Sequence, residues 1–309
     1  MAKTTTTIAS NSRQETSRLA SLVAELAQGE GISPSRLADV KFMRTTHCRP
    51  RGPVSYEPGI FIIVQGRKTG YLGRRRFVYD ANNYLVLAVP LPFECEVEGT
   101  PEAPLLGVKI GITPATVAEL CMQIEQGAPM KRKHLQAIEA TPLDEALSNC
   151  AERLLECLRS ADDARILGPQ IAREITYRVL LGPLGHNLRA LAAPHSHFGQ
   201  ISRVLNQIHA DYARSLDVGT FARYAGMSVS TFHAHFKAVT SSSPLRYLKN
   251  VRLHKARMLM VNEGANASTA ASQVGYESAS QFSREFKRLF GDAPTAVANQ
   301  LRRSLIRLA

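Results

Sequence analysis

Near the carboxyl end of the chain, residues 269–296 read TAASQVGYESASQFSREFKRLFGDAPTA. Small and polar residues first predict a short helix, followed by a tight turn at Gly275-Tyr276. A second helix then follows, with Ser278 as its N-cap and Gly291 ending it before Pro294. The stretch therefore predicts two helices that meet at an angle across a glycine turn.

The second helix of this stretch has two contrasting faces. Apolar residues recur at spacings of three and four, so we expect one face to be buried, with Phe282, Phe286, Leu289 and Phe290. The opposite face carries Ser280, Gln281, Arg284, Lys287 and Arg288. A polar, basic helix presented by a glycine turn fits the major groove of DNA.

The same pattern occurs once more, about fifty residues earlier, in residues 217–243. There the sequence predicts a first helix over 218–225, a turn at Gly226-Met227 and an N-cap at Ser228. The second helix of this unit should bury Phe232, Phe236 and Val239. A lone amphipathic helix is more often an ordinary solvated surface, but the repetition favours two helix-turn-helix units.

Pro244 and the helical stretch LRYLKNVRLHKARMLMV lie between the two units. Seventeen helical residues span about 25 Å at 1.5 Å per residue. Such a rigid connection can place two DNA-reading helices about 34 Å, or one DNA turn, apart on one side of the duplex.

Residues 196–302 resemble the DNA-binding domain of AraC-family transcriptional regulators. Four segments carry the resemblance: RLHKARML at 252–259, AASQVGY at 270–276, QFSREFK at 281–287 and GDAP at 291–294. Three amino-terminal segments also resemble the effector domain of a subset of that family, namely 56–58, 64–68 and 107–109. The family implies a cupin-like sensor, a homodimer, operator DNA and RNA polymerase as partners, and a bacterial regulator associated with the nucleoid.

The resemblance and the helix pattern together give the candidate DNA-binding residues. The family's base-reading positions in the first unit correspond to Ser230, His233 and Ala234. The full expected set is Ser228, Ser230, Thr231, His233, Ala234 and Lys237 in the first unit, and Ser278, Ser280, Gln281, Ser283, Arg284, Lys287 and Arg288 in the second.

Charge is distributed unevenly along the chain of 309 residues, whose formal net charge is +12. From residue 196 onward there are 15 Lys and Arg against 6 Asp and Glu, a net charge of +9, which leaves +3 for the first 195 residues. A basic carboxyl-terminal third and a nearly balanced remainder indicate that one domain binds a polyanion.

Other features of the sequence indicate where the protein is expected to reside and how it is divided into domains. The amino terminus lacks an apolar signal-peptide core, and the longest apolar run, 85–89, is too short to cross a bilayer. Five cysteines without a Cys-x-x-Cys spacing favour a reducing cytoplasm. We expect a disordered tail over 1–13, an effector-binding and dimerisation domain over 14–193, and a DNA-binding domain over 194–309.

The predicted fold class is α+β, with a cupin-like β-barrel and a helical dimerisation region before an all-helical domain. A helix is expected from Leu19 to Leu26. Strands are expected at 40–46, 59–65, 69–72, 75–79, 84–89, 93–97 and 105–111, because short apolar runs alternate there with Gly, Pro and Asn. From Pro114 onward helices are expected throughout, at 114–126, 143–159, 164–181 and 184–192, before the linker 193–195.

An enzyme is the rival class of function. A metal-dependent cupin needs closely spaced histidines, and none occurs between His47 and His134. His233 and His235 point to different faces of a helix, so they make a poor metal pair. No phosphate-binding glycine loop or nucleophile elbow is present, and we expect no catalytic residue, metal or cofactor.

The barrel offers several alternative effector-binding features. A basic hairpin, with Arg67, Lys68, Arg74, Arg75 and Arg76, would suit an anion, although a solvated surface is the commoner role for such a hairpin. An apolar pocket for a neutral ligand would use Tyr56, Phe61, Tyr84 and Phe93. A third alternative is a regulator that binds DNA constitutively and whose barrel only dimerises.

Two cysteine-containing features also remain open. Cys48 lies beside Arg49 and Arg51, which would favour a reactive thiolate that senses redox state or electrophiles, against the commoner idle cysteine. Leu143, Leu147, Cys150, Leu154 and Cys157 form a stripe that suits either a dimer seam or packing within the domain, and the family resemblance favours the dimer.

Overall fold

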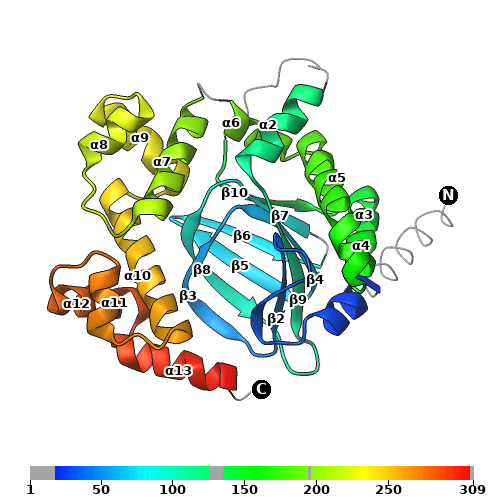
Figure 1. The fold of residues 1–309 in the computed structure, drawn as a ribbon, viewed down its shortest axis with the longest axis horizontal. Coiled ribbons are helices and arrows are strands. Elements are labelled where there is room, and N and C mark those ends of the chain that lie inside the picture. Colours follow the sequence, from blue (N-terminus) through cyan, green and yellow to red (C-terminus); the bar gives the residue numbers. More distant parts are fainter. Residues whose placement is uncertain (1–17, 82, 125–134, 194–195, 307–309) are drawn as a thin grey trace.

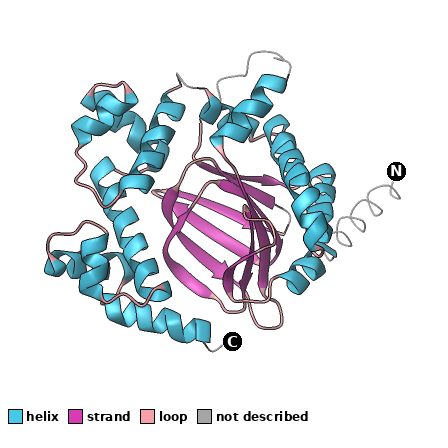
Figure 2. Cartoon of the chain, in the orientation of Figure 1, coloured by secondary structure: helices cyan, strands magenta, loops and turns pink. Residues whose placement is uncertain are grey.

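The computed structural model describes residues 18–81, 83–124, 135–193 and 196–306 (Figure 1). The expected tail at 1–13 lies outside these residues. A helix over 18–26 opens the described chain, as the sequence predicts. Two β-sheets follow, and Figure 2 shows them at the centre of the molecule with helices on both flanks.

The strands form two antiparallel sheets whose inner faces enclose the amino-terminal core. The six-stranded sheet has the order β1-β2-β9-β4-β7-β10, with β1 Gly31–Pro34, β2 Val40–Thr45, β9 Leu105–Gly111, β4 Gly59–Gln65, β7 Asn83–Leu87 and β10 Ile138–Pro142. The four-stranded sheet has the order β3-β8-β5-β6, with β3 Arg49–Tyr56, β8 Leu91–Glu98, β5 Arg67–Leu72 and β6 Arg75–Asp80. The predicted α+β architecture with a strand-rich first domain is confirmed.

Three strands were not predicted, and one of them corrects the expectation that only helices follow Pro114. β10 pairs with β7 at the sheet edge, yet its sequence IEATP is too short to show a period. β3 contains two prolines, at positions 50 and 53, which a strand tolerates here because β3 is an edge strand. β1, also an edge strand, is only four residues long.

The helices of the first domain lie near their expected positions. They are α2 Pro114–Gln123, α3 Glu145–Cys157, α4 Ala161–Ile166, α5 Gly168–Leu181 and α6 Gly185–Ala192. The single helix expected over 164–181 is two helices, because the chain breaks at Leu167 and Pro169 then begins the next helix. Part of the expected segment 114–126 and of the linker 193–195 lies outside the described residues.

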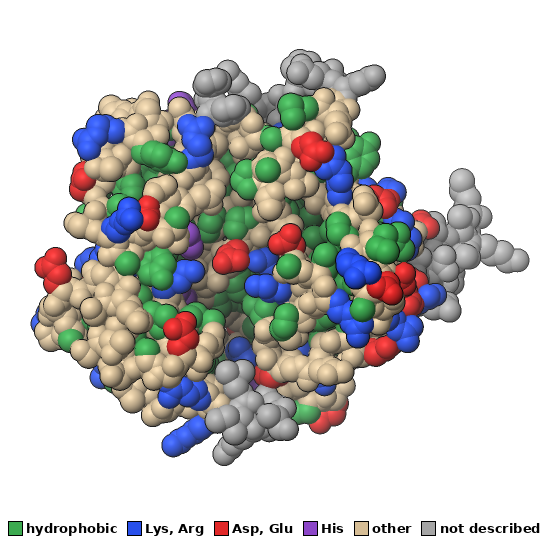
Figure 3. Space-filling view, viewed as in Figure 1, with side chains coloured by type: hydrophobic (Ala, Val, Ile, Leu, Met, Phe, Trp, Pro, Cys, Tyr) green, Lys and Arg blue, Asp and Glu red, His purple; other side chains and the backbone are tan. Residues whose placement is uncertain are grey.

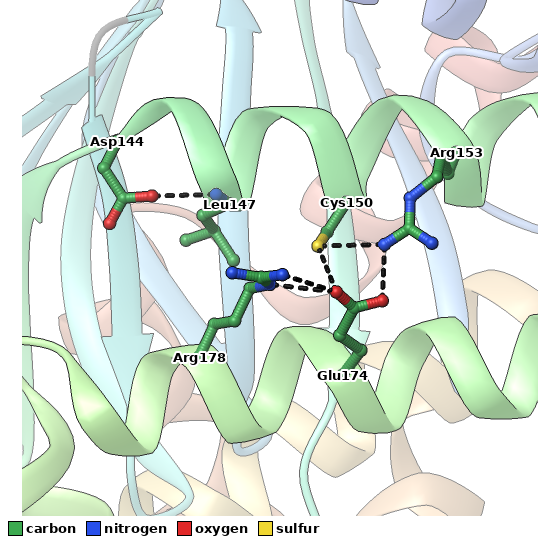
Figure 4. A network of polar contacts seen from close by, with 6 residues as sticks. All are labelled: Asp144, Leu147, Cys150, Arg153, Glu174 and Arg178. Carbon is green, nitrogen blue, oxygen red and sulfur yellow. Dashed lines mark hydrogen bonds and ion pairs between the residues drawn. The ribbon is translucent and has the colours of Figure 1, made fainter.

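The cysteine-containing stripe of α3 packs within the chain. Its residues Leu147, Cys150, Leu154 and Cys157 are buried, and α3 packs against α5. Figure 4 shows a polar network beside them, in which the Glu174 carboxylate accepts from Arg153, Arg178 and the Cys150 thiol. The arginines hold the pKa of Glu174 down to about 2. Of the two alternatives for this stripe, a dimer seam or packing within the domain, the structure therefore shows packing within the domain.

In residues 196–306, which the structure describes, the second domain contains seven helices, from α7 onward. Their bounds are α7 His197–Asp211, α8 Val218–Ala225, α9 Val229–Thr240, α10 Pro244–Asn262, α11 Ala267–Gln273, α12 Ala279–Phe290 and α13 Pro294–Ile306. In Figure 1 these helices lie on the side of the sheets opposite to α3, α4 and α5.

The two helix-turn-helix units differ in how they join the rest of the molecule. The core of the first unit, including Phe232 and Phe236, is continuous with the core of the barrel. The core of the second unit, including Phe282 and Phe286, is a separate cluster. Helix α10 runs between them, with Val251 in the first cluster and Leu253 in the second.

No helix in the described ranges is both long enough and apolar enough to span a membrane.

Candidate DNA-binding interface and effector site

The two reading helices, α9 and α12, begin in the same way. Each follows a glycine with positive φ, Gly226 at 66° and Gly275 at 82°. Each has a serine N-cap, since Ser228 accepts from the Thr231 amide at 3.2 Å and Ser278 accepts from the Gln281 amide at 3.3 Å. The turns and caps predicted from the sequence are confirmed in both units.

The turn of the second unit is fixed by a close approach of backbone to backbone. A Cβ atom on Gly275 would lie 2.2 Å from the carbonyl oxygen of Ala213, so only glycine fits there. The guanidinium of Arg252, on α10, donates to the carbonyl oxygens of Tyr212, Arg214 and Gly275 at 2.7–3.0 Å. Arg252 thus anchors this turn, a role that the sequence reading did not assign.

Most of the expected DNA-binding side chains are exposed on the outer faces of α9 and α12. In contrast, Ser278 and Ser283 are half-buried. The exposed set is Ser228, Ser230, Thr231, His233, Ala234, Lys237, Ser280, Gln281, Arg284, Lys287 and Arg288. On the inner faces Phe232, Phe236, Phe282 and Phe286 are fully buried. Leu289 and Phe290, expected in the core, are only half-buried because they lie at the end of α12.

Arg284 and its neighbour Glu285 have different surroundings. Glu285 accepts from Lys249 at 2.7 Å, from Tyr276 at 2.8 Å and from Gln281 at 3.3 Å. Within the residues that the structure describes, Arg284 makes no hydrogen bond or ion pair with protein. The Glu285 carboxylate is therefore already engaged, and the Arg284 guanidinium is available to a ligand.

The two histidines of α9 also differ. His233 is exposed on the reading face. The His235 ring lies 3.9 Å from the ring of His197 on α7, and burial, together with that neighbour, lowers the pKa of His235. His235 therefore packs α9 against α7, while His233 remains on the outer surface.

Helix α10 is attached to the barrel by two polar contacts. The Tyr247 hydroxyl donates to the carbonyl oxygen of Pro90 at 2.6 Å. Arg257 donates to the carbonyl oxygen of Pro53 on β3 at 3.4 Å, and its guanidinium lies 4.5 Å from the centre of the Phe290 ring on α12. Arg257 thus touches both a barrel strand and the second reading helix.

Inside the barrel, aromatic side chains from both sheets gather in one cluster. The Tyr56 ring stacks on Phe61 at 5.2 Å and meets the edge of Phe93 at 5.1 Å, and Phe77 lies 5.8 Å from Phe93. We name Tyr56, Phe61, Phe77 and Phe93 the interior aromatic cluster. A Cβ atom on Gly70 would lie 2.2 Å from the Phe77 ring, so this glycine makes room for the cluster.

Lys68 enters the same interior. Its side chain is buried, and its Nζ donates to the Tyr56 hydroxyl at 3.0 Å and lies 4.0 Å from the Met43 sulfur. A second lysine, Lys109, lies 5.8 Å from the Phe61 ring and pairs with Glu57 at 3.8 Å. Burial lowers the pKa of Lys109, although Glu57 opposes the shift.

The structure does not bring all the expected effector residues together. Arg67, Arg74, Arg75 and Arg76 are exposed, whereas Lys68 points inward from the same hairpin. Tyr84 pairs with Ile62 across the strands, while Phe61 pairs with Leu85, so Tyr84 faces away from the interior aromatic cluster. Burial and then Asp144 raise the pKa of Tyr84 to about 12.

Sequence reasoning missed Phe77, Tyr79, Cys95 and Lys109 as members of this interior. The alternation of β9 was the available signal for Lys109, which lies opposite Phe61 in the register. Cys48 is exposed, and its two neighbouring arginines are bound to carboxylates, Arg49 to Glu30 and Arg51 to Glu94. These guanidinium groups are therefore engaged away from the Cys48 thiol.

Two helix-turn-helix units joined by one helix and attached to a barrel define the class of this protein. Residues 36–187 match the family described as AraC-type transcriptional regulator N-terminus, and residues 221–300 match a helix-turn-helix domain family. The chain belongs to the AraC family of transcriptional regulators.

Curated relatives match about a third of the chain. A putative AraC-like transcription regulator of Streptomyces lividans is 37% identical over 94 residues, which cover 30% of this chain and 31% of that protein. The regulator AlkR of Acinetobacter baylyi is 35% identical over 95 residues, which cover 31% of each chain. The chain thus aligns with about a third of the length of these relatives, and they are transcription regulators.

Solved structures match nearly the whole chain at low identity. Apo ToxT of Vibrio cholerae superimposes with a TM-score of 0.58 at 12% identity, covering 84% of this chain and 97% of that chain. Wild-type ToxT bound to an unsaturated fatty acid gives 0.59 at 13% identity, covering 84% and 94%. This likeness shows the same two-part fold.

Proposed function

We propose that this protein is a one-component transcriptional regulator that reads operator DNA with α9 and α12 and responds to a small molecule held in its barrel. Residues 194–309 would form the DNA-binding part and residues 14–193 the sensing and dimerising part. The observation that carries the proposal is the pair of reading helices, each capped by serine after a glycine turn and each exposing polar and basic side chains.

The distribution of charge supports the assignment of DNA binding to the second domain. The segment from residue 196 onward holds +9 of the net charge of +12. Lys237, Lys287 and Arg288 lie toward the ends of their helices, where they suit phosphate contacts. Ser230, His233, Gln281 and Arg284 lie nearer the helix starts, where base contacts are expected.

The barrel supports an effector-responsive regulator over a constitutive one. Its interior holds two lysines beside aromatic rings, and α10 joins it to both helix-turn-helix units. A related fold, ToxT, has been solved with a fatty acid bound. In the described ranges no three His, Cys, Asp or Glu side chains gather as metal ligands would.

Homodimerisation, contact with RNA polymerase and a place in the bacterial cytoplasm with the nucleoid are parts of the same proposal. Because the α3 stripe is buried, a dimer would need another face. Helices α4 and α5 and the residue between them expose large apolar side chains that suit this role: Ile166, Leu167, Tyr177 and Leu181.

Selection of duplexes from a randomised DNA library by the full chain tests the proposed function. We expect enrichment of a motif in two parts, separated centre to centre by about one helical turn. Selection with His233→Ala should relax one part, and selection with Gln281→Ala should relax the other. Absence of any enriched motif at low salt would contradict the proposal.

A further inference from the structure

Lys68 is a buried cation without a counter-ion. Lys68 is 5% exposed, and it forms none of the ion pairs found in the described part of the chain. The carboxylates of the adjacent strand β8 face other partners, since Glu94 binds Arg51 and Glu96 accepts from Tyr71. An ammonium group taken out of water costs several kcal/mol unless an opposite charge compensates it.

The polar groups nearest to Lys68 do not supply a negative charge at neutral pH. Burial is the largest effect that raises the pKa of Cys95 and of Tyr79, so the thiol and the phenol stay protonated. Burial opposes the charged form of Lys68, yet the pKa of Lys68 is raised, and the Tyr56 hydroxyl, which accepts a hydrogen bond from Nζ, favours the ammonium form. The lysine therefore carries its charge, and its ammonium group has three donors for one oxygen acceptor at 3.0 Å.

Beside this cation lies a largely apolar surface. The Lys68 Nζ is 5.5 Å from the centre of the Tyr56 ring, and the rest of the interior aromatic cluster continues from that ring. The Nζ of Lys109 lies 5.8 Å from the centre of the Phe61 ring. Figure 3 shows a hollow over the sheets, with hydrophobic side chains in its depth and charged side chains at its rim.

We propose that the barrel interior binds a monocarboxylic acid with an apolar body, whose carboxylate is held by Lys68 Nζ and the Tyr56 hydroxyl and whose body lies against the interior aromatic cluster. A charge-assisted bond to Lys68 would supply the missing counter-ion. The aromatic rings would remove the body of the acid from water. This inference rests on the proposed function and names the chemical class of its effector.

A series of contacts also connects the site to the DNA-binding helices. Tyr56 and Pro53 belong to the same strand, β3, and the Pro53 carbonyl accepts from Arg257. Arg257 in turn covers the Phe290 ring at the end of α12. An acid bound at Tyr56 therefore acts on a strand that contacts both α10 and α12.

Calorimetric titration and thermal melting of the full chain test the proposal with two acids. The probes are 2-naphthoate, which is flat and aromatic, and octanoate, which is linear, each compared with its neutral amide. We expect at least one acid to bind and raise the Tm, and its amide to bind at least tenfold more weakly. Equal binding of acid and amide, or binding of neither acid, would overturn the proposal.

Matched variants locate the carboxylate. Lys68→Met keeps most of the length of the side chain and should weaken acid binding at least tenfold, without lowering the Tm of the free protein, because it removes an uncompensated buried charge. Arg67→Met, the adjacent outward residue of the same strand, should bind the acid normally. Tyr56→Phe keeps the ring and should weaken binding severalfold. Wild-type affinity in Lys68→Met would overturn the assignment.

Fluorescence anisotropy with the selected duplex, recorded on the same samples, separates the two proposals. Acid binding without DNA binding would count against the proposed function alone. DNA binding by a chain whose acid affinity does not depend on Lys68 would count against the effector site alone. If Lys68→Met fails to fold, the Tyr56→Phe variant and the comparison of acid with amide still test whether the barrel binds a carboxylate at this site.

Discussion

The Tyr247 hydroxyl lies 2.6 Å from the carbonyl oxygen of Pro90, which bonds the helix between the two reading units to the barrel. The same hydroxyl lies 2.9 Å from His209 Nε2. A hydroxyl has one proton, so when Tyr247 donates to Pro90 it must accept from His209. His209 therefore carries a proton on Nε2, and because burial and then Lys255 lower its pKa to about 4, the ring is neutral at pH 7.

Removing this hydroxyl should loosen the attachment of α10. Tyr247→Phe leaves the Pro90 carbonyl and His209 Nε2 without their partner, and we expect a loss of about 1–3 kcal/mol in the free energy of unfolding. Urea denaturation of the full chain measures this loss. Tyr224→Phe, at an exposed site on α8, is the control and should leave the midpoint unchanged. An unaltered midpoint for Tyr247→Phe would show that the contact contributes nothing.

Acid should destabilise the protein through its buried histidines. Burial lowers the pKa of His209 to about 4 and that of His254 well below its ordinary value near 6.5. Between pH 6.5 and pH 4 the unfolded chain binds these protons and the folded chain does not, so stability falls as the pH falls through this window. Glu174, with a pKa of about 2, keeps its charge throughout that range.

Urea midpoints recorded at pH 7.5 and pH 5.0 measure this dependence. Replacing His209 with Gln should make the difference between the two midpoints smaller, because one depressed pKa is removed. Replacing the exposed His233 with Ala should leave the difference as it is. Stability that rises toward pH 5.0 would contradict the assignment of neutral buried histidines.

Two glycines with similar φ should respond differently to substitution. Gly275 has φ 82° and no room for a Cβ, whereas Gly291 has φ 88° and nothing within 4 Å. Gly291→Ala should cost about 1 kcal/mol from backbone strain alone. Gly275→Ala adds a clash with Ala213 and should cost roughly 2–4 kcal/mol. Equal thermal shifts for the two variants would disprove the close approach.

His233→Ala should relax sequence preference and keep most of the affinity. His233 is exposed on the reading face of α9, next to Ala234, which offers only a methyl group for contact with thymine. We expect the preference to relax at one or two base pairs, measured by competition with single-base variants of the selected duplex. A uniform loss on all duplexes would instead make His233 a contact to the DNA backbone.

Arg284→Ala should reduce operator affinity at least tenfold without lowering the Tm. Its guanidinium is free of protein partners in the described chain and can bind guanine O6 and N7, a contact worth about 1–3 kcal/mol. Arg165→Ala, on α4, removes another exposed arginine and should bind DNA normally. Early melting of Arg284→Ala would make the residue structural, and normal DNA binding would remove it from the DNA surface.

The two reading units could be predicted closely because their signals are local. Glycine at the turn, serine at the cap and phenylalanine at helical spacing each act within one or two turns of chain. The strands β3 and β10 depend on partners far away in sequence, so prolines and a short length concealed them.

The effector-binding residues could be predicted only in part from the sequence. The sequence placed Lys68 among five charges of one hairpin, but strand register decides which side chain points inward. Register also separated Tyr84 from Phe61. The absence of a counter-ion for Lys68 in the described chain depends on which way the acids of β8 face, and that follows only from the assembled sheets.

Hydroxyl-radical footprinting of the full chain on the selected duplex tests whether α9 and α12 each read one part of the operator. We expect two protected patches on one side of the DNA, about 10 base pairs apart. Replacing Ser230, His233 and Lys237 with Ala should remove one patch, and replacing Gln281, Arg284 and Lys287 with Ala should remove the other. A single patch, or two patches that both variants weaken equally, would contradict the assignment of α9 and α12 as separate reading helices.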